Sequence, residues 1–181
     1  MNHNVFIYRS VSPESAPALD FRKGAIRRFR GLGLKAVNTI NLHATVARYH
    51  NFAHSVEDLA SAMRTQPETS TEHTVNPVTA ARVIGRNRLA GTASFALALD
   101  SPELIQGHAH YVRLLGETRT SLKSPHVTLL KATNIHSHDD IAEITQWMEE
   151  RMPDTIGLNP VSIAWSMWDD KDDTPASRLA S

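Results

Sequence analysis

The sequence predicts an α+β fold made of two related lobes on a largely antiparallel sheet. Strand-like and helix-like segments are mixed along the chain, without the strict β-α-β alternation of a parallel, doubly wound fold. A short strand with the pattern His-x-Thr also occurs twice, at His43 and at His126. Each copy is followed, after about ten residues, by a capped amphipathic helix, and this recurrence indicates two related lobes.

Alternating or β-branched apolar runs predict six strands. The glycines and polar residues of Gly85–Gly91 predict a hairpin loop between two of them. The predicted strands are Val5–Ser10, Ile40–Ala47, Val78–Ile84, Thr92–Leu99, His126–Lys131 and Val161–Trp168.

Serine N-caps predict where the helices begin. Ser55 precedes Asp58 by three residues, and Ser137 precedes Asp140 by three, which is the spacing of a capping box. Apolar residues then recur at helical spacing, so each helix has one face to pack on the sheet. We expect helices after Ser55, Ser101 and Ser137, and an earlier one within Pro17–Arg30.

Composition limits the class of protein. A chain of 181 residues with 41% hydrophobic content can bury a core, and we expect one bilobal domain over residues 1–168 with an acidic tail over 169–181. No apolar run approaches the roughly 20 residues that span a bilayer. We therefore expect a cytoplasmic monomer without a membrane partner. The absence of cysteine excludes disulfides, thiolate nucleophiles and cysteine-bound zinc.

Charge is unevenly distributed along a chain of zero net charge. The first 50 residues hold 8 Lys or Arg against 2 Asp or Glu, whereas residues 131–181 hold 4 against 10. A basic N-terminal third can face an anionic ligand. For the basic run Arg22–Arg30, however, a solvated helix face is the more usual interpretation.

The paired histidines carry the functional prediction. Residues i and i+2 of a strand share one face, so His43 lies beside Thr45 and His126 beside Thr128. If the lobes pack side by side, two imidazoles and two hydroxyls converge. One imidazole can take a proton from an attacking oxygen while the other protonates the leaving oxygen, and the hydroxyls can hold phosphate oxygens. Structural histidines are the alternative, because a lone histidine in a strand more often has that role.

The chain resembles the two-histidine phosphoesterases, which include the bacterial 2′-5′ RNA ligases and the RNA 2′,3′-cyclic phosphodiesterases. Two H-x-(T/S)-x motifs with apolar flanks mark that family, and "LHATV" and "PHVTLL" match them. "VFIYRS" is similar to the opening strand, and the similarity extends loosely to about residue 168. The segment "ARYHNFAH" after the first motif is less typical of the family.

The resemblance implies a bilobal fold with a pseudo-twofold cleft, and catalysis without metal or cofactor. His43 and His126 would be the acid and base, with Thr45 and Thr128 as phosphate holders. The substrate would be a cyclic 2′,3′- or 2′,5′-linked phosphodiester of an RNA terminus or nucleotide, either hydrolysed or reversibly ligated. The alternative function is a non-catalytic RNA or nucleotide-binding module.

Three more residues are candidates for substrate binding. Arg48 and Lys131 each lie five residues after a histidine, so they oppose the histidine face on a continuous strand and reach a phosphate only if the strand ends or bulges. Otherwise a surface or capping role is expected for both. Three aromatic residues could stack a base, with Tyr49 ahead of Phe52 and Trp165, although core packing is the more usual role for each of them.

A metal site is not expected. On a helix, residues i and i+2 are about 200° apart, so His108 and His110 cannot grip one ion together. His136 and His138 stand where a loop enters a helix. The sequence has no HExxH, Walker A or GxGxxG motif.

Overall fold

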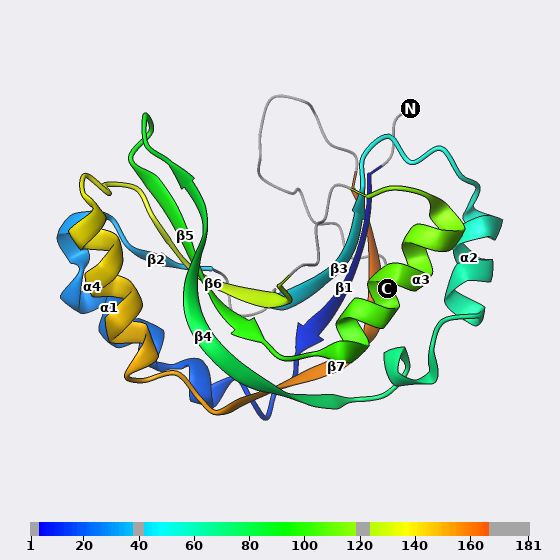
Figure 1. Ribbon diagram of the computed structural model, residues 1–181, viewed down its shortest axis with the longest axis horizontal. Helices are drawn as coiled ribbons and strands as arrows, with labels where there is room; N and C mark the ends of the chain where they lie inside the picture. Colours follow the sequence, from blue (N-terminus) through cyan, green and yellow to red (C-terminus); the bar gives the residue numbers. More distant parts are fainter. Residues whose placement is uncertain (1–3, 38–41, 119–123, 167–181) are drawn as a thin grey trace.

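The computed structural model describes residues 4–37, 42–118 and 124–166 (Figure 1). It confirms the predicted α+β class and antiparallel sheet, because every recorded strand pair is antiparallel. The strands are β1 (Asn4–Val11), β2 (Lys35–Ala36), β3 (His43–Tyr49), β4 (Thr74–Asn87), β5 (Thr92–Leu99), β6 (His126–Ala132) and β7 (Thr155–Ser166). All six predicted strands are present, and the short β2 was not predicted.

The helices begin where the serine caps predict. In both predicted capping boxes, the serine side chain accepts from the third helical amide and the aspartate accepts from the serine amide. Ser101 likewise caps its helix by accepting from Leu104 N. The helices are α1 (Phe21–Arg28), α2 (Val56–Arg64), α3 (Pro102–Leu115) and α4 (His138–Glu149), and short 3-10 turns occupy Pro17–Leu19, Arg30–Leu32 and Glu68–Ser70.

The strands form one sheet in the order β2-β6-β3-β1-β7-β4-β5, and β5 also pairs with β6. Six strands therefore form a closed circuit. Two joins in this circuit are short. A single recorded pair, Ala44 with Val127, links β3 to β6, and the pairs between Thr74–Pro77 and Thr155–Leu158 link β4 to β7. These joins divide the circuit into β7-β1-β3, here called lobe 1, and β4-β5-β6, here called lobe 2.

The chain repeats one sequence of elements. β1, α1, β3, α2 and β4 correspond in order to β5, α3, β6, α4 and β7. The two halves exchange their last strands, since β4 pairs with β5 of the second half and β7 pairs with β1 of the first. This correspondence is the pseudo-twofold relation that the two His-x-Thr segments predict.

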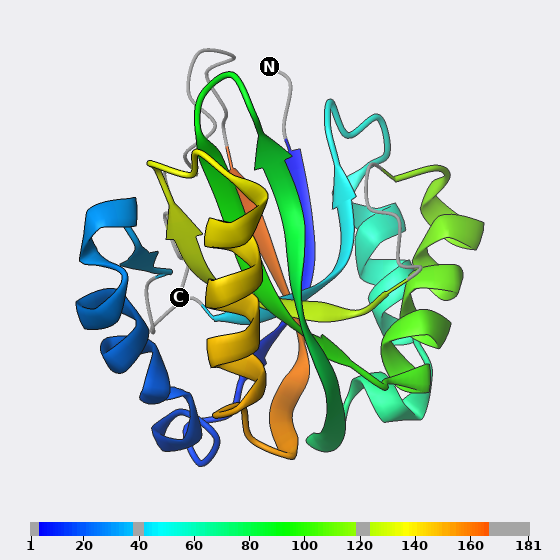
Figure 2. The same ribbon diagram turned by 60° about the vertical axis from the view of Figure 1, so that its left-hand side comes forward.

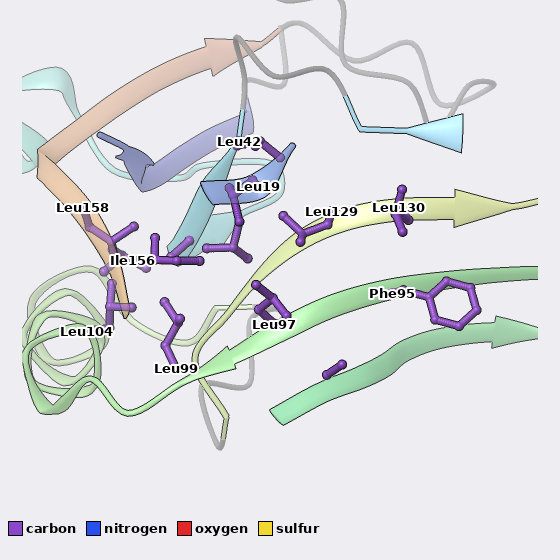
Figure 3. Close-up of a cluster of buried hydrophobic side chains, with 14 of the residues drawn as sticks. Leu19, Leu42, Phe95, Leu97, Leu99, Leu104, Leu129, Leu130, Ile156 and Leu158 are labelled. Carbon is purple, nitrogen blue, oxygen red and sulfur yellow. The ribbon is translucent and has the colours of Figure 1, made fainter. Parts of the chain in front are cut away.

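The helices cover the two lobes on opposite sides of the molecule (Figures 1 and 2). α3 packs on β3 and on α2, whereas α4 packs on β4 and on α1. The buried strand faces turn toward these helices and form the apolar core, which Figure 3 shows around Leu97, Leu129 and Ile156. The opposite face of the sheet is left without a covering helix among the described elements.

None of the described helices is long and apolar enough to cross a membrane. The predicted acidic tail at 169–181 lies outside the described residues, as do Trp168 and Ile40 at the ends of two predicted strands. The expected division of the chain at residue 168 stays a prediction.

Candidate active site

The two His-x-Thr segments meet at the join between the lobes. Ala44 of β3 is paired with Val127 of β6 in antiparallel register. This register sets His43 opposite Thr128 and Thr45 opposite His126, and directly opposed residues share a face of the sheet. The structure therefore brings the four predicted residues together on one face, which we call the histidine face. All four side chains are partly exposed.

A bulge in each of these strands changes which side chains follow. β3 pairs Thr45 with Tyr8 but Ala47 with Ile7, so one extra residue of β3 is inserted between the two pairs. Val46 and Ala47 are consequently both buried. The alternation is reset, and Arg48 returns to the histidine face, opposite Phe6.

β6 repeats the same irregularity. Thr128 pairs with Ala96 but Leu130 with Phe95, so Leu129 is inserted and Lys131 returns to the histidine face. The expectation that Arg48 and Lys131 oppose the histidines holds for a continuous strand, and the bulges reverse it. Both cations lie on the same face as the imidazoles, Arg48 partly buried and Lys131 exposed.

His126 is oriented by the chain that precedes it. Its Nδ1 lies 2.9 Å from the carbonyl oxygen of Ser124. A carbonyl only accepts, so Nδ1 carries the hydrogen and Nε2 is the nitrogen left for proton transfer. Arg82 donates to Ser124 Oγ at 3.2 Å, which brings another cation near His126. Neither Ser124 nor Arg82 was predicted, because only the strand pairing of β4, β5 and β6 brings them together.

His43 lies against two aromatic rings instead. Its ring centroid is 4.9 Å from that of Phe6 and 5.6 Å from that of Tyr8, and both contacts are edge-to-face. Sequence reasoning missed both aromatic residues. The alternation in "VFIYRS" was the available signal, because it sets Phe6 and Tyr8 on the face opposite Val5 and Ile7.

The sheet is basic. The seven described strands contain no Asp or Glu, while Arg48, Lys131 and Arg82 lie on the histidine face and Lys35 pairs with Lys131. A face with cations and without carboxylates favours an anionic ligand. It also lacks the carboxylate oxygens that would hold Mg²⁺ or Ca²⁺.

Tyr49 does not join this group, and the preference for it as the stacking residue is corrected. The bulge that turns Arg48 toward the histidines turns Tyr49 to the opposite face, where it is 5% exposed in the core. Burial raises the pKa of its phenol to about 12. Phe52 packs against Tyr49 with ring centroids 5.6 Å apart, and the side chain of Trp165 lies outside the described part of the chain.

The H-x-H pair of α3 has a structural role. His108 donates from Nδ1 to the carbonyl of Val46, and His110 donates from Nε2 to the carbonyl of Ala62, both at 2.8 Å. The two imidazoles thus fasten α3 to two different elements. Among the described residues, no three His, Asp or Glu side chains are grouped so that they could hold a metal ion.

A cavity of about 280 Å³ lies away from the histidine face, at the join between β4 and β7. Ser12, Glu14 and His73 are among the residues that line it. It contains one imidazole and none of the predicted site residues. We therefore assign the candidate active site to the histidine face, where two imidazoles and two hydroxyls are paired.

The architecture of this chain is shared with known solved structures. No family model and no curated protein matches the chain. Solved structures do match over nearly its whole length, and the three below are two-histidine phosphoesterases with the 2′-5′ RNA ligase-like fold. The chain shares that fold, as the sequence resemblance predicted.

Three of these structures illustrate the match. Usb1 of Kluyveromyces marxianus has a TM-score of 0.56 at 11% identity, covering 90% of this chain and 93% of its own. LigT of E. coli, in complex with 3′-AMP, has a TM-score of 0.55 at 14% identity, covering 99% and 98%. TT0787 of Thermus thermophilus has a TM-score of 0.57 at 16% identity, covering 96% and 92%. At these identities the likeness establishes the fold alone.

Proposed function

We propose that this protein is a metal-independent phosphoesterase that hydrolyses, or reversibly ligates, cyclic 2′,3′- or 2′,5′-linked phosphodiesters of RNA ends or nucleotides. The observation that carries this proposal is the register of β3 and β6, which opposes each histidine to the threonine of the other motif. Acid, base and two hydroxyl donors then surround one point, as in-line displacement at phosphorus requires.

The histidines perform complementary proton transfers. A neutral imidazole takes a proton from water as its oxygen bonds to phosphorus, and the second, protonated imidazole gives a proton to the ribose oxygen as the P–O bond breaks. The product is a 2′- or 3′-phosphomonoester, and the two histidines have exchanged protonation states. Ligation is the same sequence with a ribose hydroxyl as the nucleophile in place of water: its oxygen bonds to phosphorus as the P–O bond of the cyclic phosphate breaks. Water at its bulk concentration favours hydrolysis.

The remaining groups on the histidine face stabilise charge. The hydroxyls of Thr45 and Thr128 can donate to the non-bridging oxygens, whose negative charge grows as the nucleophile attacks. Arg48 and Lys131 would offset the charge of the phosphate from the two sides of the join. Known structures with this fold support a nucleotide ligand, since LigT has been crystallised with 3′-AMP and Usb1 with uridine monophosphate.

Turnover of the four 2′,3′-cyclic nucleotides and of a 2′-5′-linked dinucleotide tests this function. We expect phosphomonoester products and unchanged rates in excess EDTA, because the described strands of the histidine face contain no carboxylates for a metal. The His43→Ala/His126→Ala double variant serves as the control against contaminating activity. Binding of these nucleotides without turnover would instead indicate a non-catalytic binding module. Loss of activity in EDTA that zinc or manganese restores would exclude the metal-independent mechanism.

A further inference from the structure

The pseudo-twofold relation can be followed residue by residue across the histidine face, and it breaks in the strand beside each histidine strand. In lobe 1, Ser10, Tyr8 and Phe6 of β1 pair with His43, Thr45 and Arg48. In lobe 2, Ala98, Ala96 and Ser94 of β5 pair with His126, Thr128 and Lys131. The reactive and cationic residues correspond, whereas two aromatic rings in lobe 1 correspond to a serine and an alanine in lobe 2.

The two rings of lobe 1 form a continuous aromatic surface. Phe6 and Tyr8 are stacked with centroids 5.3 Å apart and planes 20° from parallel. Both side chains are partly exposed on the histidine face. Core packing does not require them there, because the apolar core positions of β1 are taken by Val5 and Ile7, which are both fully covered.

We propose, on the basis of the function proposed above, that Phe6 and Tyr8 stack on the nucleobase of the substrate. The site then takes a nucleoside phosphodiester with its phosphate between the histidines and its base over lobe 1. A phosphodiester without a base is a poor substrate.

The distances fit one nucleoside. Both ring centroids lie within 5.6 Å of the His43 imidazole, which would contact the phosphate. A nucleobase is separated from its 2′- or 3′-phosphate by the ribose alone, so a phosphate at His43 sets its base within reach of these rings. Stacking on aromatic side chains is how proteins bind unpaired bases, and it tolerates all four because each base has a π-face.

The hydroxyl of Tyr8 can make a polar contact with the substrate in addition to the stacking of its ring. Within the part of the chain that the structure describes, its hydroxyl oxygen has no hydrogen-bond partner. A tyrosine hydroxyl both donates and accepts, so it can bond to a ribose hydroxyl or to a base edge. Tyr8→Phe therefore separates this contact from stacking.

The competing explanation is that the rings only hold the His43 imidazole in place. Such a positioning role would affect every substrate equally, whereas base stacking affects only substrates that have a base. Comparison of 2′,3′-cyclic AMP with glycerol 1,2-cyclic phosphate distinguishes the two, because both contain a five-membered cyclic phosphodiester and only the former has a base.

We expect Tyr8→Leu and Phe6→Leu each to lower kcat/KM for 2′,3′-cyclic AMP by about 10- to 100-fold, mainly through KM, since stacking on one aromatic residue has about that worth. The same variants should change turnover of glycerol 1,2-cyclic phosphate by less than about threefold. Tyr8→Phe should retain most of the activity toward 2′,3′-cyclic AMP. Ser94→Ala, at the position equivalent to Phe6, is the matched control and should leave the preference between the two substrates unchanged.

Equal losses on both substrates would overturn the stacking role and assign the rings to positioning of His43. Equal wild-type turnover of the two substrates would also overturn it. If neither substrate is turned over, the proposed function fails, and calorimetric binding then tests the stacking surface separately. In that case 3′-AMP should bind more tightly than glycerol 2-phosphate, and Tyr8→Leu should abolish the difference. Equal affinities in the wild type would contradict the inference.

Discussion

The two lobes are alike in the strand that carries the histidine and differ in the strand beside it. β3 and β6 share the His-x-Thr pattern, the bulge and the cation that the bulge turns to the histidine face. β1 and β5 share only their register with these strands. On the histidine face β1 carries Phe6 and Tyr8 where β5 carries Ser94 and Ala96, and on the buried face it carries Arg9 where β5 carries Leu97.

This difference separates two requirements of the site. Proton transfer needs two similar groups on opposite sides of the phosphate, and the symmetric strands supply them. A phosphodiester end has a nucleoside on one side and water on the other, so its recognition needs an asymmetric surface. Equivalent substitutions in both lobes therefore test proton transfer, and substitutions at positions where the lobes differ test recognition.

The largest expected effect is a loss of turnover, and it should be similar for the histidines of the two lobes. His43→Ala and His126→Ala should each lower kcat for a 2′,3′-cyclic nucleotide by about 10²- to 10⁴-fold, the usual contribution of a positioned acid or base. Both side chains are partly exposed on a sheet face, so the fold should persist. Initial rates measured beside circular dichroism spectra check this prediction. A variant with an intact spectrum and a wild-type rate would remove that histidine from the mechanism.

Arg9 is the basis of the second prediction. It is 1% exposed, and its guanidinium donates to the carbonyls of Asn159 at 2.7 Å and Thr69 at 3.2 Å, and also to those of Glu72 and Leu158. Burial lowers the pKa of Arg9, and the charge of Glu103 opposes that shift. The side chain ties β1 to β7 and to the segment between α2 and β4, a role that Leu97 does not have in lobe 2.

Arg9→Leu copies the residue of lobe 2 into lobe 1. We expect it to lower the free energy of unfolding by about 3 kcal/mol, because four partly or fully buried carbonyls lose their donor. Arg9→Lys should have an intermediate effect, since an ammonium cannot reproduce the planar arrangement of donors. Urea unfolding of the three proteins measures this. A leucine variant as stable as the wild type would show that these carbonyls find other partners.

Most of the architecture follows from local pattern. The capping boxes at Ser55 and Ser137 fixed two helix starts, and alternation located six strands, because these signals depend on neighbours in sequence. β2 was missed because two residues, Lys35 and Ala36, are too few to show a period.

The site was predicted only in part, and the bulges explain why. An inserted residue such as Val46 or Leu129 is an ordinary apolar residue, and nothing in the sequence marks it as unpaired. Strict alternation therefore gave Arg48 the wrong face. The same inserted residue in β3 sends Tyr49 into the core, so the aromatic residues of the histidine face come from β1 instead.

The third prediction concerns the two cations that the bulges position. Arg48→Met and Lys131→Met should each raise KM by about tenfold, because each removes a charged partner of the phosphate. The arginine variant should show the larger change, since Arg48 is partly buried and Lys131 is exposed to screening by water and salt. Arg64→Met, in the last turn of α2, is the control for loss of one positive charge. KM values no different from that control would contradict the role of the bulges.

The smallest expected effect is on the pH dependence of stability, and it differs between the capping boxes at Ser55 and Ser137. Asp140 accepts from the amides of His136 and Ser137, and these bonds lower its pKa. Asp58 accepts from the amide and hydroxyl of Ser55, which lowers its pKa, and the His54 imidazole 4.0 Å away adds to that shift. An aspartate whose pKa is depressed by folding stabilises the protein above its unfolded pKa of about 3.9, and this contribution is lost as pH falls through the folded value.

Melting temperatures should therefore fall as pH is lowered below about 4. Asn cannot be protonated in this range, so Asp140→Asn should lower the melting temperature at pH 7 and flatten its acid dependence. Asp58→Asn should do the same to a smaller extent, because Asp58 has one backbone amide partner where Asp140 has two. Thermal melts of the three proteins from pH 7 to pH 3 measure both slopes. The slope of melting temperature against pH could be unchanged in Asp140→Asn, or it could change more in Asp58→Asn. Either result would show that the additional amide bond from His136 does not make stability depend on ionised Asp140.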